Sequence, residues 1–533
     1  MDLLSDIVVL RTLIIFFTTL ILSQLRCKMI QLLIIAYFFI CLIYEIIIGF
    51  CQISGIITTT NSVYVLTGSF DNPGPYGGYL AIIIIILGAI IIRNDFEVRN
   101  NKYYNWITII ILVLSGNMLV LSQSRSAILA LISSALLFVI KTDYLREKIK
   151  PKIYKYRFII LPVVVVFITG AYLMKKPSAD GRLFMDKICI KAIYDNNWNG
   201  AGHGQFGRAY GKIQANYFKA QIDEKGKDDM DWRAINEHDR MIADCPDNAF
   251  NEFLFIGVEE GMVAMLIFII VIVAAIVVSF RRNTIWCYGL IAFAVFSMFS
   301  YPLHVKQFQF LLPILLALCI SDKDLSDQDG KKTPNVFSYK DRKQLVRLTV
   351  KLMVLVVLSI SILSRLPEMK QHKQAELEWK KAERWYKMGY YEYVVEDCDT
   401  LLTHMRYDCS FLFAYGQSLN KIGNYEKSDS VLKLGVEISS DPMFWNVMGN
   451  NSLAKGDFKE AEERYKHAFY MVPNRLYPLY LLGKLYHEER DTVRFLDMAD
   501  RVESFIPKIE SMNTERLRAE IRDMKSEYMT EMY

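Results

Sequence analysis

The distribution of apolar and polar positions divides the chain into two parts. Residues 1–365 contain long apolar runs such as 80–92 and 262–280, whereas residues 366–533 are rich in Glu, Lys and Tyr and contain no such run. A helix needs about 20 mostly apolar residues to cross the hydrocarbon of a bilayer. The first part therefore predicts a polytopic all-α bundle of about ten spans, at 7–23, 30–50, 76–92, 105–121, 125–140, 157–174, 252–280, 285–302, 306–320 and 345–364.

Lysine and arginine alternate between the short connections of this bundle. The connections 24–28, 93–104, 141–156, 281–282 and 321–344 are basic, and the connection 51–75 has no Lys or Arg. Basic connections stay in the cytoplasm. We therefore expect the N-terminus, the long connection 175–251 and everything after residue 365 to lie outside it. The first apolar run is not preceded by a basic residue, so we interpret it as a retained helix rather than a cleaved signal.

Overall composition agrees with a membrane protein. Apolar residues make up 53%, charged residues 22%, and mean hydropathy is +0.20, which excludes a wholly soluble enzyme. The net charge of +5 is too small to indicate nucleic acid as a partner. There is no C-x-x-C pair and hence no zinc ribbon. Spacing alone leaves open whether Cys189 bridges Cys245, or Cys398 bridges Cys409, in an oxidising compartment.

The second part contains an internal repeat. Gly416, Gly449 and Gly483 are 33 and 34 residues apart, and Gly423-Asn424-Tyr425 matches Gly456-Asp457-Phe458. This period, with small and aromatic residues at fixed offsets, is typical of tetratricopeptide repeats. We predict an α-solenoid of about three or four such units in a soluble domain, 366–533, which binds a partner on its concave face.

Candidate chemistry gathers on the long connection 175–251. It holds Arg182, the glycine-rich run 200–206 and Arg208, and it leads into Asn251-Glu252. Two other connections on the same expected side carry Arg125 and the stretch 301–306. Arginines at the ends of spans can hold a phosphate bidentately. The pattern indicates an anionic, sugar-bearing ligand.

These residues carry a resemblance to a known family. Gly68-Ser69-Phe70-Asp71-Asn72-Pro73, Ser124-Arg125-Ser126, Arg182 with Gly200–Phe206, and Asn251-Glu252-Phe253-Leu254 with Glu259 and Gly261 resemble, in this order, motifs of one superfamily. That superfamily comprises O-antigen ligases, polysaccharide polymerases and protein O-oligosaccharyltransferases. The likeness covers most of residues 50–320, and some members carry a tetratricopeptide tail.

The resemblance implies an enzyme of the bacterial inner membrane with its catalytic connection in the periplasm. It would move a glycan from undecaprenyl diphosphate to lipid A-core, to another glycan or to a protein, without metal or cofactor. We favour O-antigen ligase-like transfer, ahead of protein O-oligosaccharyltransfer and polymerisation. The non-enzymatic alternative is a membrane scaffold or transporter whose repeats recruit partners. The expected diphosphate-binding residues are Arg125, Arg182, Arg208 and Lys306, and those expected to shape the site are Asn72, Pro73, Gly202, Gly204, Asn251 and Glu259.

The general base is the least defined residue. Ligase-type members often have His immediately before the Asn-Glu pair, and this chain has Phe250 there. Our order of candidates is Asp247, Glu252, His304 and His203; Asp247 would share a face with Phe250 if the helix began that early.

Each of these candidate residues also has a simpler interpretation. Arg125 also fits a side chain that snorkels to headgroups, and Asn251-Glu252 fits an ordinary helix start. The glycine-rich run fits a plain turn. The pair Asp229-Met230-Asp231 lies in a mixed-charge stretch, away from every motif, and we expect no metal there.

Overall fold

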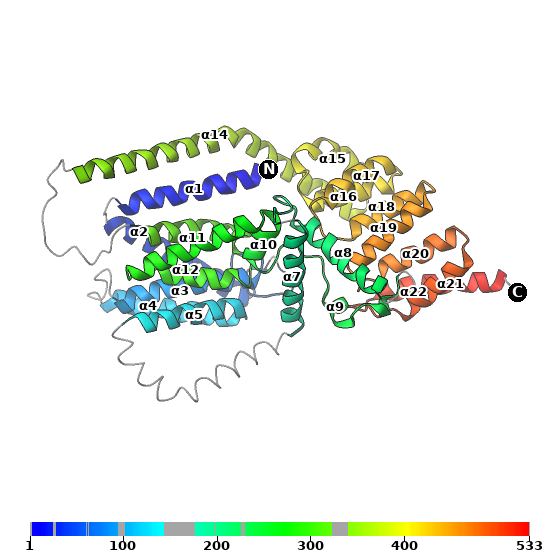
Figure 1. Ribbon diagram of the computed structural model, residues 1–533, viewed down its shortest axis with the longest axis horizontal. Helices are drawn as coiled ribbons and strands as arrows, with labels where there is room; N and C mark the ends of the chain where they lie inside the picture. Colours follow the sequence, from blue (N-terminus) through cyan, green and yellow to red (C-terminus); the bar gives the residue numbers. More distant parts are fainter. Residues whose placement is uncertain are drawn as a thin grey trace, which may run out of the picture.

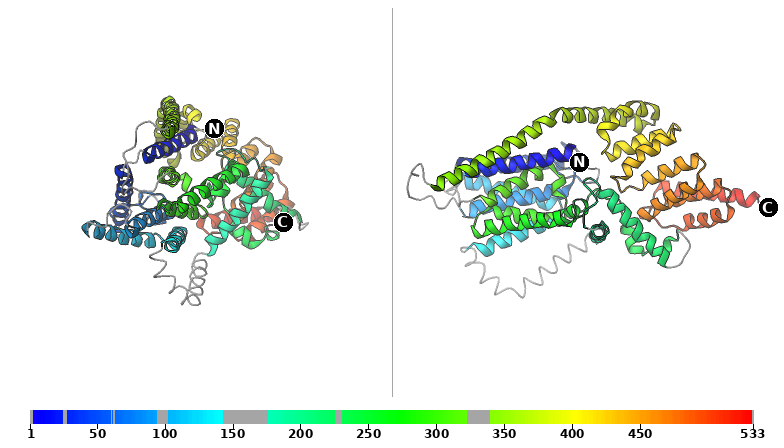
Figure 2. Two further views of the ribbon diagram at one scale, coloured as in Figure 1. Left: turned by 60° about the vertical axis from the view of Figure 1, so that its left-hand side comes forward. Right: turned by 45° about the horizontal axis from the view of Figure 1, so that its top comes forward.

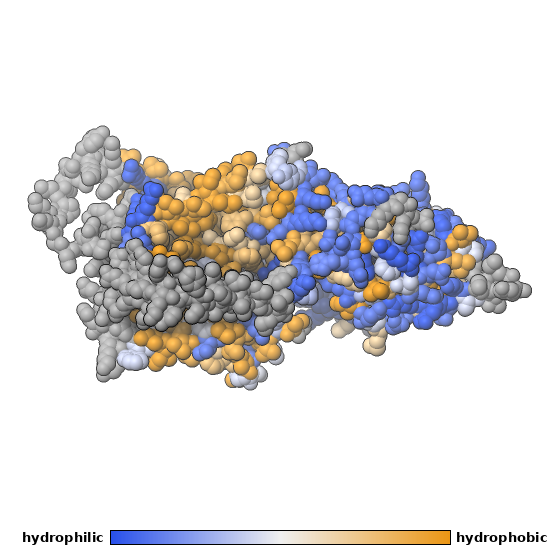
Figure 3. Space-filling view, turned by 60° about the horizontal axis from the view of Figure 1, so that its bottom comes forward, coloured by the Kyte–Doolittle hydropathy of each residue, from blue (hydrophilic) through white to orange (hydrophobic). Residues whose placement is uncertain are grey.

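The computed structural model describes residues 3–24, 28–59, 61, 63–93, 102–142, 176–196, 198–224, 230–321 and 339–531. Within these ranges the secondary structure is helical and contains no strand. Apolar helices form a bundle at one end of the molecule, and shorter amphipathic helices form a second body at the other (Figure 1). Hydrophobic residues gather on the surface of the bundle and hydrophilic ones on the second body (Figure 3).

The helices of the bundle overlap the predicted spans that fall within the described residues, and the number of spans stays a prediction. Four helices have stretches long and apolar enough to cross a membrane, at Leu32–Ile53, Pro73–Arg93, Met262–Arg281 and Val346–Met388, and others are shorter. The predicted span 157–174 lies outside the described residues. The helices are α1 (Leu3–Gln24), α2 (Lys28–Ile53), α3 (Pro73–Arg93), α4 (Lys102–Leu121), α5 (Arg125–Lys141), α11 (Met262–Arg281), α12 (Trp286–Ser297), α13 (Lys306–Ile320) and the first part of α14 (Tyr339–Met388).

The bundle has two distinct ends. Helices α3, α5, α11 and α13 begin at the end that faces the second body, which we call the site end (Figure 1). Arg93, Lys141 and Arg281 lie in the last turns of α3, α5 and α11, at the opposite end. These three positions agree with the expected alternation of basic connections; the orientation of the bundle in the membrane stays a prediction.

The expected single helix 252–280 is wrong. Helix α10 (Glu252–Glu259) ends before Gly261, and α11 begins at Met262. Gly261 has φ +91°, and a Cβ there would lie 2.6 Å from the carbonyl oxygen of Trp198. The Met262 N–H donates to that same oxygen at 2.9 Å. The approach of residue 198 therefore breaks the helix, and α10 lies outside the apolar span.

The long connection 175–251 is not a loop but is mostly helical. It forms α7 (Lys176–Asp195), α8 (Phe206–Glu224), the 3₁₀ turn η2 (Trp232–Ala234) and α9 (Glu237–Ile242). Helix α7 lies across the site end, perpendicular to the spans, in both Figure 1 and the right view of Figure 2.

The second body is a series of antiparallel helices. Positive φ values recur at Gly389, Gly423, Gly456 and Arg490, at intervals of 34, 33 and 34 residues, each just before a helix start. These turns agree with a repeated helix pair; the tetratricopeptide assignment itself stays a prediction. The helices are α15 (Tyr391–Met405), α16 (Cys409–Lys421), α17 (Tyr425–Val436), α18 (Met443–Ala454), α19 (Phe458–Met471), α20 (Tyr477–Glu488), α21 (Thr492–Ser504) and α22 (Met512–Glu531).

The second body and the 176–258 segment share one hydrophobic core. Phe218 and Ile188 belong to the same buried cluster as Phe469 and Leu482. Helix α8 packs on α19, and Gln214 Nε2 donates to the backbone oxygens of Asp244, at 2.9 Å, and of Met471. The predicted boundary at residue 365 falls inside α14, which runs on into the second body without a break.

Neither cysteine pair that the sequence left open is bridged. Cys189, Cys245, Cys398 and Cys409 all have free thiols. Cys245 Sγ instead lies 3.0 Å from the Arg475 guanidinium.

Candidate functional site

The connection between α12 and α13, residues 298–305, organises the site end. The carbonyl oxygen of Phe299 accepts a hydrogen bond from Arg182 Nη1 at 3.1 Å. Further along, the Leu303 N–H donates to Glu252 Oε2 at 2.9 Å. One short connection thus contacts both an arginine and a carboxyl group of separate helices.

Arg182 and Arg125 lie close together, as the sequence predicted. Arg182 lies on α7, with its guanidinium 4.6 Å from the centre of the Phe250 ring. Arg125 begins α5, after Ser124. Burial lowers the pKa of Arg182, and the nearby charge of Arg125 lowers it further. Two neighbouring cations, one at the start of α5 and one in the second turn of α7, favour an anionic ligand.

Tyr301 joins the arginine pair. Its ring contacts Phe250 at 5.4 Å between centroids, and its side chain hydrogen-bonds that of Asn72. Burial raises the pKa of Tyr301, whereas Asn72 and the charge of Arg182 oppose this rise. The phenol therefore keeps its proton and can donate it to an anion. Asn72 directly precedes Pro73, the first residue of α3.

The segment around residue 70 is fixed by α2. The Ser69 N–H donates to Glu45 at 3.0 Å, and the Gly68 N–H donates to Gln52 Oε1 at 2.8 Å. Through these bonds, Glu45 and Gln52 fix the segment that carries Asn72.

Asp186 lies beside Arg182 and was not among the residues predicted from the sequence. It lies four residues after Arg182 on the same helix, and burial raises its pKa to about 6, against the lowering effect of Arg182. The spacing of an acidic residue four positions from an arginine was the signal that could have identified it. Tyr64, whose charge acts on Arg182, gave no such signal.

Glu252 and His304 form the second part of the site. Glu252 is buried at the start of α10, and its Oε1 lies 3.7 Å from His304 Nδ1. Burial raises the pKa of Glu252 to about 8, and the neighbouring Glu259 adds to the rise. The His304 ring packs edge-on against Phe255 at 4.3 Å and keeps 32% of its side chain exposed. Its partial burial lowers its pKa, and the charge of nearby His203 lowers it further. At neutral pH Glu252 is therefore mostly protonated and His304 mostly neutral.

The glycine-rich run closes against the end of α10. The Gly202 N–H donates to the carbonyl oxygen of Glu259 at 2.9 Å. The Glu259 side chain accepts from the N–H groups of Gly204 and Phe206, so it caps the start of α8. Gly202 and Gly204 have φ +107° and +71°, a left-handed backbone that suits glycine.

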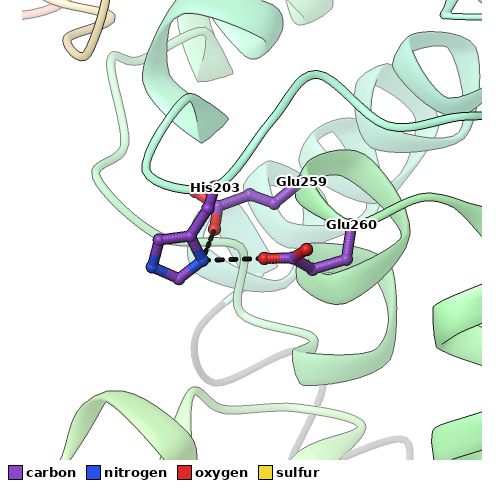
Figure 4. Close-up of side chains that lie close together, drawn as sticks. All are labelled: His203, Glu259 and Glu260. Carbon is purple, nitrogen blue, oxygen red and sulfur yellow. Dashed lines mark hydrogen bonds and ion pairs between the residues drawn. The ribbon is translucent and has the colours of Figure 1, made fainter. Parts of the chain in front are cut away.

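His203 projects from this run toward two glutamates. Its Nδ1 lies 2.7 Å from Glu260 Oε1 and 3.7 Å from Glu259 Oε2 (Figure 4). Their ligand atoms lie within 4.8 Å of one another, so this group is the one that could hold a metal ion among the described residues. Glu259 already accepts two backbone hydrogen bonds, which use about half of the lone-pair positions of its carboxylate.

The remaining predicted residues lie away from the arginine pair or serve the backbone. Asn251 caps α10, with its Oδ1 accepting from the Leu254 N–H at 3.3 Å. Asp247 precedes that cap outside any helix, so the expected shared face is wrong; its pKa is raised by burial and by Asp441 of the second body. Arg208 forms an ion pair with Glu437 at 3.0 Å. Lys306 is exposed at the start of α13.

The fold and the site define a class: a helical membrane protein with two neighbouring arginines at one end of its bundle. Comparison with known families extends this. Residues 110–269 match the family model described as O-Antigen ligase. The match runs from α4 into α11 and includes Arg125, Arg182 and Glu252. It supports the ligase and polymerase superfamily and indicates a membrane enzyme of that type. No match was found among curated proteins.

Proposed function

We propose that the protein is a glycosyltransferase of the O-antigen ligase type. It transfers a glycan from undecaprenyl diphosphate to lipid A-core or a similar acceptor, at the periplasmic face of the inner membrane. The observation that carries this proposal is the proximity of Arg125 and Arg182, from separate helices, at the site end of an apolar bundle.

The reaction needs positive charge at the leaving group. The acceptor hydroxyl forms a bond to the anomeric carbon, and the bond from that carbon to the diphosphate oxygen breaks. Negative charge grows on the diphosphate as it leaves, so cations placed there stabilise the transition state more than the bound donor. Arg125, Arg182 and the Tyr301 hydroxyl are the groups we assign to this role.

The acceptor hydroxyl must also lose its proton. We assign this step to the pair of Glu252 and His304 in place of Asp247. A neutral His304 beside an ionised Glu252 can take the proton, since the carboxylate then stabilises the imidazolium. The same connection, 298–305, contacts Arg182 through Phe299 and Glu252 through Leu303, which supports one site rather than two.

Transfer assays on the purified full-length protein test the roles of these residues. The donor would be a synthetic undecaprenyl-diphosphate glycan. Arg182→Ala and Arg125→Ala should each lower the rate about 100-fold or more, as for loss of a group that stabilises a transition-state anion. Arg208→Ala, the matched control, removes an arginine that pairs with Glu437 and should stay within a few-fold of the unchanged protein. Full activity of Arg182→Ala would contradict the mechanism.

The acceptor class is decided by glycan analysis after deletion. Loss of lipid-linked O-polysaccharide would support ligation to lipid A-core. Loss of protein glycans would support the second candidate, a protein O-oligosaccharyltransferase, which the close packing of the second body on α8 favours because that body can bring a protein to the site. Shortened chains would indicate a polymerase. Unchanged glycans would favour the scaffold or transporter.

The proposed orientation has its own test. A cysteine at exposed position 220 of α8 should react with a membrane-impermeant reagent in intact spheroplasts, whereas one at exposed position 281 should not. The reverse pattern would contradict a periplasmic site.

A further inference from the structure

Helix α7 presents an apolar stripe that no described part of the chain covers. Leu183, Ile190 and Tyr194 are 63%, 45% and 58% exposed. Spacings of seven and four residues place the three on one line along the helix. The opposite face is buried in the core that α7 shares with the second body, through Phe184, Met185, Ile188, Cys189, Ala192 and Ile193. The stripe is therefore separate from the packing that fixes α7.

Charged side chains border the stripe on both sides. Lys191 is exposed along one edge. Lys187, four residues after Leu183 and three before Ile190, lies near the line itself, where it hydrogen-bonds the Tyr217 hydroxyl at 2.7 Å and pairs with Asp239 at 3.5 Å. Arg182 and Asp186 lie along the other edge, toward the site. An apolar stripe with flanking lysines is typical of a helix that lies in the plane of a membrane surface.

The position of α7 agrees with this assignment. Helix α7 lies across the site end, perpendicular to the spans (Figures 1 and 2). Beyond its last turn, the Trp198 ring contacts Tyr194 at 4.2 Å between centroids. The Trp198 carbonyl oxygen accepts from Met262 at the start of α11, where Val263 and Leu266 are exposed. The stripe thus continues into the lipid-facing surface of a span, through aromatic side chains of the type that gather at membrane interfaces.

We propose that α7 binds the outer leaflet of the bilayer, with Leu183, Ile190 and Tyr194 at the boundary between headgroups and acyl chains. Lys191, beside the stripe, faces the lipid phosphates. The other edge then holds Arg182 at the depth where the diphosphate of a lipid carrier lies, a consequence that rests on the proposed function. The binding of α7 itself does not depend on it.

Spin labelling tests the contact without an activity measurement. A nitroxide is attached at position 190 in the full-length protein, in nanodiscs of phosphatidylethanolamine and phosphatidylglycerol. Power saturation then compares its accessibility to oxygen, which partitions into lipid, with that to a water-soluble nickel chelate. Matched labels are placed at 267 on the exposed surface of α11 and at 220 on α8. Unmodified protein exposed to the label corrects for native cysteines.

The expected result is that the label at 190 favours oxygen, as at 267, while the label at 220 favours the nickel chelate. A label at 190 that behaves like the one at 220 would overturn the proposal. A label at 190 that is immobilised and shielded from both reagents would also overturn it, in favour of a protein surface packed on the stripe. Neither outcome would decide the proposed function, which the transfer assays test separately.

Discussion

At the scale of single residues, Phe250 accounts for the departure of this chain from the ligase pattern. The position that often holds His in ligase-type members here carries an aromatic ring beneath the Arg182 guanidinium, 4.6 Å away. Such a ring attracts the cation and fixes its plane. On the proposed function, Phe250 would position Arg182, and the base would come from another residue.

Replacing Phe250 tests this positioning role. Phe250→Leu should lower the transfer rate about 3- to 30-fold, the equivalent of a cation–π contact of about 0.5–2 kcal/mol, because the arginine loses its aromatic contact but keeps its bond to Phe299. Phe250→Tyr, which retains the ring, should restore most of the rate. The effect should appear in kcat more than in KM for the acceptor. A leucine variant as active as the unchanged protein would contradict the role.

The raised pKa of Glu252 predicts the pH dependence of transfer. Only the ionised form of Glu252 lets neutral His304 accept a proton, and with a pKa of about 8 that form is the minor one at neutral pH. The rate should therefore rise with pH, about tenfold per unit below the pKa, and level off above pH 8.

Two variants check that this profile belongs to the pair. Glu252→Gln should be slower and should lose the rise, whereas Asp247→Asn should keep it. A profile that Glu252→Gln leaves unchanged would remove Glu252 from the mechanism.

The sequence identified some of these residues better than others. Arg125 and Arg182 were found because each lies in a short motif beside an apolar run. The helical position expected for Asp247 was wrong because α10 begins only after the Asn251 cap, and Asp247 lies near Asp441, about 190 positions later in the chain; its role as a base stays untested. Such distant contacts leave no local pattern.

At the scale of elements, the glycines of α8 decide how this helix packs on the second body. A Cβ at Gly207 would lie 2.5 Å from the Ile438 carbonyl oxygen, which belongs to the backbone and cannot move alone. A Cβ at Gly211 would lie 2.8 Å from the end of the flexible Met471 side chain. The first clash is costly and the second is easily relieved.

Alanine substitutions at the two positions should separate these cases. Gly207→Ala should destabilise the protein by about 1–3 kcal/mol, as overpacking does, and lower its melting temperature in detergent. Gly211→Ala should cost clearly less. Equal melting temperatures for the two variants would show that α8 is not tightly packed against the second body.

The effect of a chelator on the transfer rate tests whether His203, Glu259 and Glu260 bind a metal ion. If these side chains only tie the glycine-rich run to α10, EDTA should leave the transfer rate unchanged, and His203→Ala should lower thermal stability slightly. A loss of activity in EDTA that added divalent metal restores, and that His203→Ala abolishes, would instead make the group a metal site.

The apolar composition of residues 252–280 did not reveal the break between α10 and α11. Residues 252–280 are almost continuously apolar, so length alone predicted one helix. The Glu259-Glu260-Gly261 sequence was the available signal, since glycine often follows the end of a helix. The partner that imposes the break, Trp198, lies on another segment and could not be inferred.

At the scale of the whole molecule, the shared core makes the second body part of the fold. The buried cluster includes residues of α7 and α8 together with those of α19 to α22. Sequence patterns predicted the bundle and the helical repeat separately, because each has its own period. They did not predict that the two would be joined through residues 176–258, since this contact involves side chains hundreds of positions apart.

Truncation tests this dependence. A chain that ends at residue 388 should expose the apolar faces of α7 and α8 and should aggregate or be cut by trypsin within 176–258. The full chain with Gly211→Ala serves as a folded control. A monodisperse, protease-resistant truncated protein would contradict the shared core.

Helix α14 gives the molecule a second rigid link between its two bodies. Each residue of a helix adds about 1.5 Å and about 100° of rotation, so one residue inserted after Pro367 would swing the repeats around the helix axis. The same repeats are held at a separate point by α8. The two links form a closed frame, in which the length of α14 fixes the orientation of the repeats relative to the bundle. Insertions of seven residues, which nearly restore the rotation, should therefore be tolerated better than insertions of two.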